Sequence, residues 1–209
     1  MTDQDYTHLA IVADRSGSMH GIASDMNGAI RSLLEDQAKE PGTLKVDITT
    51  FDDQIEFPFT DADPLSIKGD VILPRSMTAL NDAIGVTINR LGKKFSLMDE
   101  EKRPSKVVVV VVTDGLENAS REFTYDQVKK MVEEQTTQWG WTFIYLAANV
   151  DAFATGVTYG FARGSTIAYS ATAGGTESVV GSASRGVSQS RAGKTVEFTD
   201  EEREAATKE

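Results

Sequence analysis

Carboxylate and hydroxyl side chains gather where the first apolar run of the chain ends. Residues 9–13 form that run and predict a buried strand. The stretch Asp14–Ser18, with the sequence DRSGS, follows directly and offers one carboxylate and two hydroxyls. Hard cations such as Mg²⁺ prefer these oxygen ligands, so the stretch is a candidate half of a divalent-cation site. The alternative is structural: Ser16 or Ser18 caps the following helix, and Asp14 closes a turn.

Two more oxygen-bearing side chains stand at the boundaries of other predicted elements. Residues 106–113 contain six consecutive valines, which predict a strand that helices cover on both faces. Asp114 follows that strand directly, and ligands of open parallel sheets bind outside the carboxyl ends of the strands. Thr78 opens a predicted helix, where its hydroxyl either caps the helix or points outward from the edge of the sheet.

Hydrophobic periodicity predicts the elements that position these residues. Strands are expected at residues 9–13, 45–51, 55–59, 106–113, 141–147 and 166–170, and helices at residues 20–39, 152–161 and 176–191 and from residues 78 and 124 onward. Pro58 places its short strand at an edge, because proline donates no hydrogen bond to a ladder. Strands that alternate with helices indicate the α/β class. We expect a Rossmann-like, doubly wound, mostly parallel central sheet with one antiparallel edge strand and helices on both faces.

One domain is the simplest organisation for this chain. Its 209 residues are enough for one well-buried core, and the hydrophobic content of 40% is ordinary for a globular protein. We find no internal repeat and no long linker. We therefore expect a single domain over residues 8–191, with flanking polar termini at residues 1–7 and 197–209. The second of these is strongly charged and is expected to be a frayed helix or a tail.

Charge and composition exclude several classes of partner and site. The formal net charge is −11, and acids interrupt the basic residues between positions 93 and 106, so we expect no nucleic-acid partner. The absence of cysteine excludes disulfides, thiolate zinc sites and cysteine nucleophiles. The N-terminus is polar, and no apolar run approaches the roughly 18 residues that a membrane crossing needs. We expect a cytoplasmic protein with no membrane partner, with virion association left open.

The order of these motifs resembles the von Willebrand factor type A (vWA) domain. Asp14–Ser18 matches the first metal loop of that family, Thr78 before ALNDAI matches its threonine loop, and Asp114 in VTDG matches its third loop. Each motif alone is weak, but their order on matching elements makes the set specific. The resemblance covers about residues 8–191. Residues 156–191 look similar to vWA proteins of bacteria and phages rather than to integrin inserts.

The resemblance implies a metal-ion-dependent adhesion site, or MIDAS. In the family, the strands before Asp14 and Asp114 are neighbours, so the two carboxylates would meet. The cation would be Mg²⁺, or Mn²⁺ or Ca²⁺. An acidic side chain, Asp or Glu, of a partner protein would complete its coordination. The implied metal residues are Asp14, Ser16, Ser18, Thr78 and Asp114.

Four further residues lie next to these loops. Arg15 stands where the family commonly has an uncharged residue, and it either points away or helps to bind an acidic ligand. The threonine loop lacks the glycines often found there, and Ser76 is the nearest substitute for Thr78. Glu117 and Asn118 follow the third loop as ordinary loop residues or as groups that orient the ligands.

We therefore predict a metal-dependent protein-binding module without catalysis of its own. The first alternative is a structural or scaffold protein, such as a phage component, in which the metal only holds loops together. The second is a metal-dependent hydrolase. It is disfavoured because a phosphatase would place a general acid two residues after Asp14, where the chain has Ser16. The resemblance also suggests that a shift of the final helix, residues 176–191, is coupled to the metal site.

Overall fold

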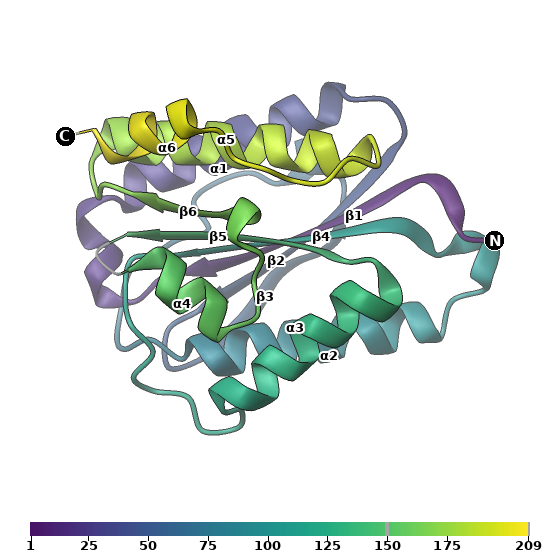
Figure 1. Cartoon of the computed structure of the whole chain (residues 1–209), viewed down its shortest axis with the longest axis horizontal. Coiled ribbons are helices and arrows are strands. Elements are labelled where there is room, and N and C mark those ends of the chain that lie inside the picture. Colours follow the sequence, from purple (N-terminus) through teal and green to yellow (C-terminus); the bar gives the residue numbers. More distant parts are fainter. Residues whose placement is uncertain (149–150, 209) are drawn as a thin grey trace.

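A six-stranded sheet forms the centre of the computed structural model, which describes residues 1–148 and 151–208. The strand order is β3-β2-β1-β4-β5-β6 (Figure 1). The strands are β1 (Asp3–Asp14), β2 (Thr43–Phe51), β3 (Ile55–Ala62), β4 (Pro104–Thr113), β5 (Thr142–Ala148) and β6 (Thr166–Tyr169). All pair in parallel except β3, which runs antiparallel to β2 at one edge. This confirms the predicted sheet and explains why Pro58 is tolerated in β3.

Helices cover both faces of the sheet, as the strand pattern predicted (Figure 1). One face packs against α1, α5 and α6, and the other against α2, α3 and α4. The helices are α1 (Ala23–Lys39), α2 (Leu80–Ser96), α3 (Tyr125–Trp139), α4 (Ala152–Thr158), α5 (Ala173–Arg191) and α6 (Asp200–Thr207). No helix in the described part of the chain combines the length and the apolar character needed to cross a membrane.

The valine run of β4 lies at the centre of both hydrophobic cores. Val108 and Val110 face the layer of α1 and α5, whereas Val109 and Val111 face the layer of α2 and α3. All four side chains are at most 1% exposed. Successive side chains of a strand point to opposite faces, so an unbroken apolar run is what a strand between two helical layers requires.

The packed structure extends beyond residues 8–191 at both ends. β1 begins at Asp3, and α6 lies on α5 beside the outer edge of β6. Arg203 of α6 donates to the carbonyl of Thr166 over 2.6 Å, and the N–H of Ser170 donates to the carbonyl of Ala206 over 2.9 Å. The segment expected as a frayed helix or tail is therefore a docked helix, which buries Ala206 in the core. Glu209 lies outside the described residues.

The last helix, predicted over residues 176–191, begins earlier, so Gly174 and Gly175 form part of the first turn of α5. A Cβ atom at Gly175 would lie 2.2 Å from the carbonyl oxygen of Ser170 and 2.9 Å from that of Ala206. A Cβ atom at Gly174 would meet nothing within 4 Å. Gly175 is therefore required by the close approach of two backbone segments.

We expect Gly175→Ala to destabilise the protein, because the new methyl group must displace the backbone at Ser170 or Ala206. The matched control is Gly174→Ala, which should be neutral or stabilising by up to about 1 kcal/mol because it only reduces the freedom of the unfolded chain. Urea unfolding of both variants measures the difference. Equal stability of the two variants would show that the backbones of Ser170 and Ala206 do not approach Gly175 closely.

Candidate metal centre

The predicted acids lie at the switch point of the sheet. The connection after β1 leads to β2 on one side, and the connection after β4 leads to β5 on the other, so the order of connections reverses between the carboxyl ends of β1 and β4. Asp14 is the last residue of β1, and Asp114 follows the last residue of β4. The hydroxyl of Thr113 donates to Asp14 Oδ2 over 2.6 Å. The structure thus brings the two loops side by side.

Both serines of the first loop lie between these carboxylates. Ser18 Oγ donates to Asp114 Oδ1 over 2.6 Å, and Ser16 Oγ lies 3.0 Å from Ser18 Oγ. The N–H of Ser16 donates to Asp14 Oδ1 over 2.7 Å, so Asp14 also closes the turn. Neither hydroxyl caps a helix: the 3-10 helix Gly17–Gly21 has no side-chain cap, and Ile22 precedes α1.

Thr78 also keeps its hydroxyl free of helix capping. The residue before α2 is Ala79, and Thr78 is held by its backbone, whose N–H donates to Asn118 Oδ1 over 2.9 Å. A Cβ atom at Gly115 would lie 3.3 Å from Thr78 Oγ1 and 3.4 Å from Ser18 Oγ. The two hydroxyls therefore converge on the backbone of Gly115, which has room for them because it has no side chain. All five residues predicted to bind metal lie together.

The electrostatics of this cluster favour a bound cation. Burial raises the pKa of Asp14 to about 6, with a smaller contribution from the charge of Asp114, and the hydrogen bonds from Thr113 and Ser16 oppose this rise. Burial also raises the pKa of Asp114, against the hydrogen bond from Ser18. Among the described residues, no lysine, arginine or histidine forms an ion pair with either carboxylate. Two buried acids and three hydroxyls without a countercharge match the ligands that a hard divalent cation prefers.

Arg15 points away from the two carboxylates. Its side chain is buried, Nη1 donates to Glu56 over 2.7 Å, and Nη2 donates to Asp52 over 3.4 Å. Arg75 of the threonine loop pairs with the same two acids, and its N–H donates to the carbonyl of Arg15 over 2.8 Å. Asp52 and Glu56 thus join the first loop to the threonine loop. Of the two orientations expected for Arg15, the structure shows the one that does not reach a ligand.

The remaining flanking residues hold the loops by hydrogen bonds. Ser76 adopts a left-handed backbone conformation with φ of 54°, the kind that glycines would favour, and its carbonyl accepts from the N–H of Gly17 over 3.0 Å. Glu117 accepts from the backbone N–H groups of Asn81 and Ser120 over 2.8 and 2.7 Å. With Asn118 bound to Thr78, these side chains orient the threonine and third loops around the cluster.

A second acidic group was not predicted. His8, Asp47 and Asp61 could also hold a cation, and they lie on β1, β2 and β3. However, the ammonium group of Lys94 already pairs with both aspartates. The pKa of Asp47 falls to about 2, because hydrogen bonds from His8 and the Asp61 N–H, with the charge of Lys94, outweigh burial. The sequence could have indicated this group through Asp47, an acid at a buried position of the predicted strand 45–51.

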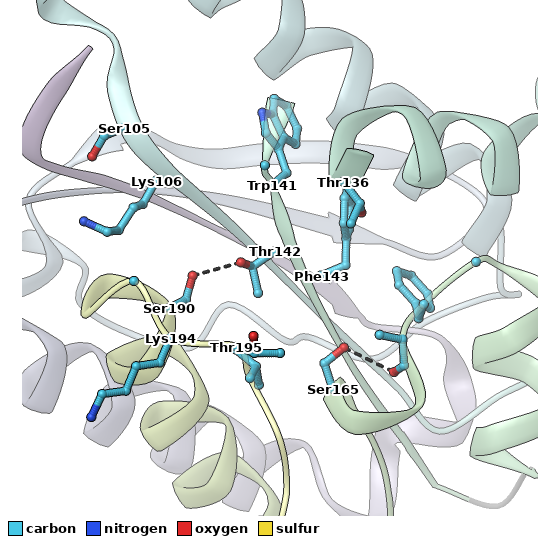
Figure 2. Close-up of a pocket in the computed structure, with 16 residues that line it drawn as sticks. Ser105, Lys106, Thr136, Trp141, Thr142, Phe143, Ser165, Ser190, Lys194 and Thr195 are labelled. Carbon is cyan, nitrogen blue, oxygen red and sulfur yellow. Dashed lines mark hydrogen bonds between the residues drawn. The ribbon is translucent and has the colours of Figure 1, made fainter. Parts of the chain in front are cut away.

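A cavity of about 540 Å³ lies at the other end of the sheet, where β4 and β5 begin (Figure 2). Trp141 and Phe143 line it, together with Thr142 and Ser190, whose hydroxyls are 2.9 Å apart. Figure 2 shows Lys106 and Lys194 on one side of this cavity. The cavity shares no residue with the acid and hydroxyl cluster, and it lies at the amino ends of the strands, opposite to the usual ligand position of such sheets.

At the level of sequence, no protein-family model matches the chain and no curated protein matches it. Solved structures do match. The vWF domain of the type V pili tip protein Mfa5 from Porphyromonas gingivalis aligns with a TM-score of 0.62 at 9% identity, over 93% of this chain and 98% of that chain.

Two longer proteins share the fold over part of their length. Proximal thread matrix protein 1 from the mussel byssus, with a zinc-occupied MIDAS motif, aligns with a TM-score of 0.57 at 13% identity, over 86% of this chain and 46% of that chain. The ArnB paralog VWA2 from Sulfolobus acidocaldarius gives 0.52 at 18% identity, over 78% and 40%. This chain spans less than half the length of either. It has the vWA fold, as the order of its motifs predicted.

We expect Asp14→Asn to stabilise the metal-free protein at pH 7.5. The raised pKa of about 6 means that the ionised carboxylate is unfavourable in the folded state, so its removal should add about 1–3 kcal/mol to the free energy of unfolding. Asparagine can keep the hydrogen bonds to Ser16 and Thr113. Urea unfolding in EDTA measures the effect. A variant less stable than the wild type would show that the charge of Asp14 is compensated inside the protein.

Asp52→Ala should be strongly destabilising, by about 3 kcal/mol, because it leaves the buried guanidinium of Arg15 without one of its partners. The neighbouring Asp53→Ala is the control, since Asp53 is exposed and should change stability by less than about 0.5 kcal/mol. Thermal and urea unfolding compare the two variants. Similar small losses in both would contradict a central role for Asp52 in joining the loops.

Proposed function

We propose that the chain is a metal-dependent protein-binding module. In this proposal Asp14, Ser16, Ser18, Thr78 and Asp114 hold Mg²⁺ or a similar divalent cation, and a carboxylate of a partner protein completes its coordination. The observation that carries the proposal is the pair of buried acids at the switch point, which face three hydroxyls and have no cationic partner among the described residues.

The chemistry of the ligand set supports binding of an acidic partner. Three of the five proposed ligands are neutral hydroxyls, so only the two aspartates offset the charge of the cation, and a partner carboxylate can still coordinate it directly. This chain would hold the cation in loops that the turn at Asp14 helps to fix, and it would leave one coordination position to the partner. The mussel thread protein, whose MIDAS motif is zinc-occupied, shows that a transition metal can also bind at such a site in this fold.

The structure gives less support to a purely structural cation. Protein groups already join the loops, through the pairs of Arg15 and Arg75 with Asp52 and Glu56 and through the bond from Gly17 to Ser76. Loops that are tied in this way do not need a metal to hold them together. We assign no catalytic step to the site, because His20, the nearest histidine in sequence, is exposed and its ring nitrogen contacts the carbonyl of Gly17.

The proposal is tested by calorimetric titration with Mg²⁺ and with Mn²⁺. We expect saturable binding to the wild type and a loss of at least about tenfold in affinity for Asp14→Asn and for Asp114→Asn, because each removes one charge from the site. Asp126→Asn, at an exposed position of α3, is the matched control and should bind like the wild type. Equal binding by all four proteins would place the cation elsewhere.

A further inference from the structure

The cavity at the amino ends of β4 and β5 has a volume of about 540 Å³, within the roughly 300–1,000 Å³ typical of pockets for small molecules. It lies where β5 extends beyond the start of β6. The pairing of these two strands begins at Tyr145 and Thr166, so no strand lies beside residues 142–144 on their outer side. Thr142 and Phe143 of this stretch line the cavity. The cavity therefore lies against an uncovered edge of the sheet.

The backbone of this edge offers hydrogen-bonding groups to a ligand. An uncovered strand edge presents N–H and C=O groups that no neighbouring strand occupies. Among the described residues, no backbone hydrogen bond joins residues 142–144 to the loops 160–165 and 193–196, which also contribute to the lining. Two hydroxyls add to these groups, because Thr142 Oγ1 and Ser190 Oγ lie 2.9 Å apart in the cavity wall. A ligand in this place would meet polar groups that are already fixed in position.

Aromatic rings form the apolar part of the lining. Trp141 and Phe143 are stacked, with their ring centroids 6.3 Å apart and their planes at 29°. Phe161 continues the group, with its centroid 5.9 Å from that of Phe143. All three side chains are buried, so packing in the core holds them in place without a ligand. A planar ring can pack against such a group in an offset or an edge-to-face arrangement.

Two lysines supply the charge of this cavity. Lys106 and Lys194 belong to the lining and lie on the side of Ser190 in Figure 2. No carboxylate lines the cavity, and neither lysine forms an ion pair within the described part of the chain. The lining therefore carries positive charge only, although the whole chain has a net charge of −11.

Acids stand near the cavity without lining it. Glu133 lies beside Gly160 of the lining and pairs with Lys129 over 4.0 Å. Glu197 and Asp5 belong to neighbouring segments, and both are exposed, so water and salt screen their charges. The ammonium groups of the two lining lysines thus remain available to an anionic group in the cavity.

We propose that this cavity binds a small organic anion in which a planar apolar ring carries a carboxylate. The ring would pack against Trp141, Phe143 and Phe161. The carboxylate has two oxygens, so it can accept from Lys106 and Lys194 and from the neighbouring hydroxyls at once. A neutral ring would leave the ammonium groups without a partner, and an inorganic anion would leave the apolar wall uncovered. The cavity shares no residue with the proposed metal centre, so this inference stands apart from the proposed function.

The test uses 2-naphthoate as the probe, titrated into the whole chain in EDTA so that no cation can hold its carboxylate. Binding is followed by ¹H–¹⁵N NMR, in which each of the two tryptophans gives an indole signal. Trp139 lies outside the lining and is 64% exposed, so Trp139→Phe assigns the two signals. We expect a saturable shift of the Trp141 signal with a Kd of about 1 mM or lower. Neutral 2-naphthamide should bind at least about tenfold more weakly, because it has no charge for the lysines.

Two double variants separate a built site from general attraction. Lys106→Gln/Lys194→Gln should bind 2-naphthoate at least about tenfold more weakly, because both ammonium groups are lost. Lys39→Gln/Lys68→Gln is the matched control, since it changes the net charge equally at exposed positions outside the lining, and it should bind like the wild type. None of the four substituted lysines is buried, and the NMR spectrum of each variant verifies its fold.

Each outcome decides the proposal. An unchanged Trp141 signal up to about 5 mM 2-naphthoate, or equal affinities for 2-naphthoate and 2-naphthamide, would overturn it. Full binding by Lys106→Gln/Lys194→Gln would overturn it too, and so would equal losses in both double variants, which would show attraction by net charge alone. A loss confined to the variant of the lining lysines, with the anion preferred, would support the site. None of these results bears on the metal centre, because no cation is present in the experiment.

Discussion

The organisation of the protein depends on two carboxylates held together out of water. Asp14 and Asp114 end neighbouring parallel strands, and like charges placed so closely in a buried position oppose folding. The chain provides hydroxyls and N–H groups around them but, in its described part, no countercharge. The valine-rich centre of the sheet provides the burial that holds the strands in register despite this cost. A site built in this way gains most from a ligand that is small and doubly positive.

The guanidinium group of Arg15 does not neutralise Asp14, although the two residues are adjacent in the sequence. A cation one residue from Asp14 could have neutralised that acid, but the guanidinium is taken by Asp52 and Glu56 of the hairpin between β2 and β3. The same acids bind Arg75, so one ion-pair network that does not include Asp14 or Asp114 fixes the first loop and the threonine loop. The loops are thereby preorganised, and a metal would enter a shape that already exists, at little cost in conformational entropy.

Local patterns predicted most of the fold. The alternation of strands and helices, the two-sided burial of β4 and the start of α3 after residue 124 depend on residues near one another in the sequence. The features that the local patterns did not predict depend on contacts between residues far apart in the sequence. Arg15 meets its acidic partners 37 and 41 positions away, and the first turn of α5 requires glycine at position 175 because the backbones of Ser170 and Ala206 approach it closely. The positions of the candidate ligands followed from motif order, whereas the inward turn of Glu117 had no local signal.

The contact between α6 and β6 also limits how the protein can assemble with others. An outer strand normally leaves unpaired N–H and C=O groups, to which another chain can add a strand of its own. Here the guanidinium of Arg203 occupies the carbonyl of Thr166, and the carbonyl of Ala206 occupies the N–H of Ser170. Contacts from α6 thus occupy two of the backbone groups through which a strand of another chain could pair at this edge. Removal of α6 would expose these backbone groups to pairing with a strand of another chain.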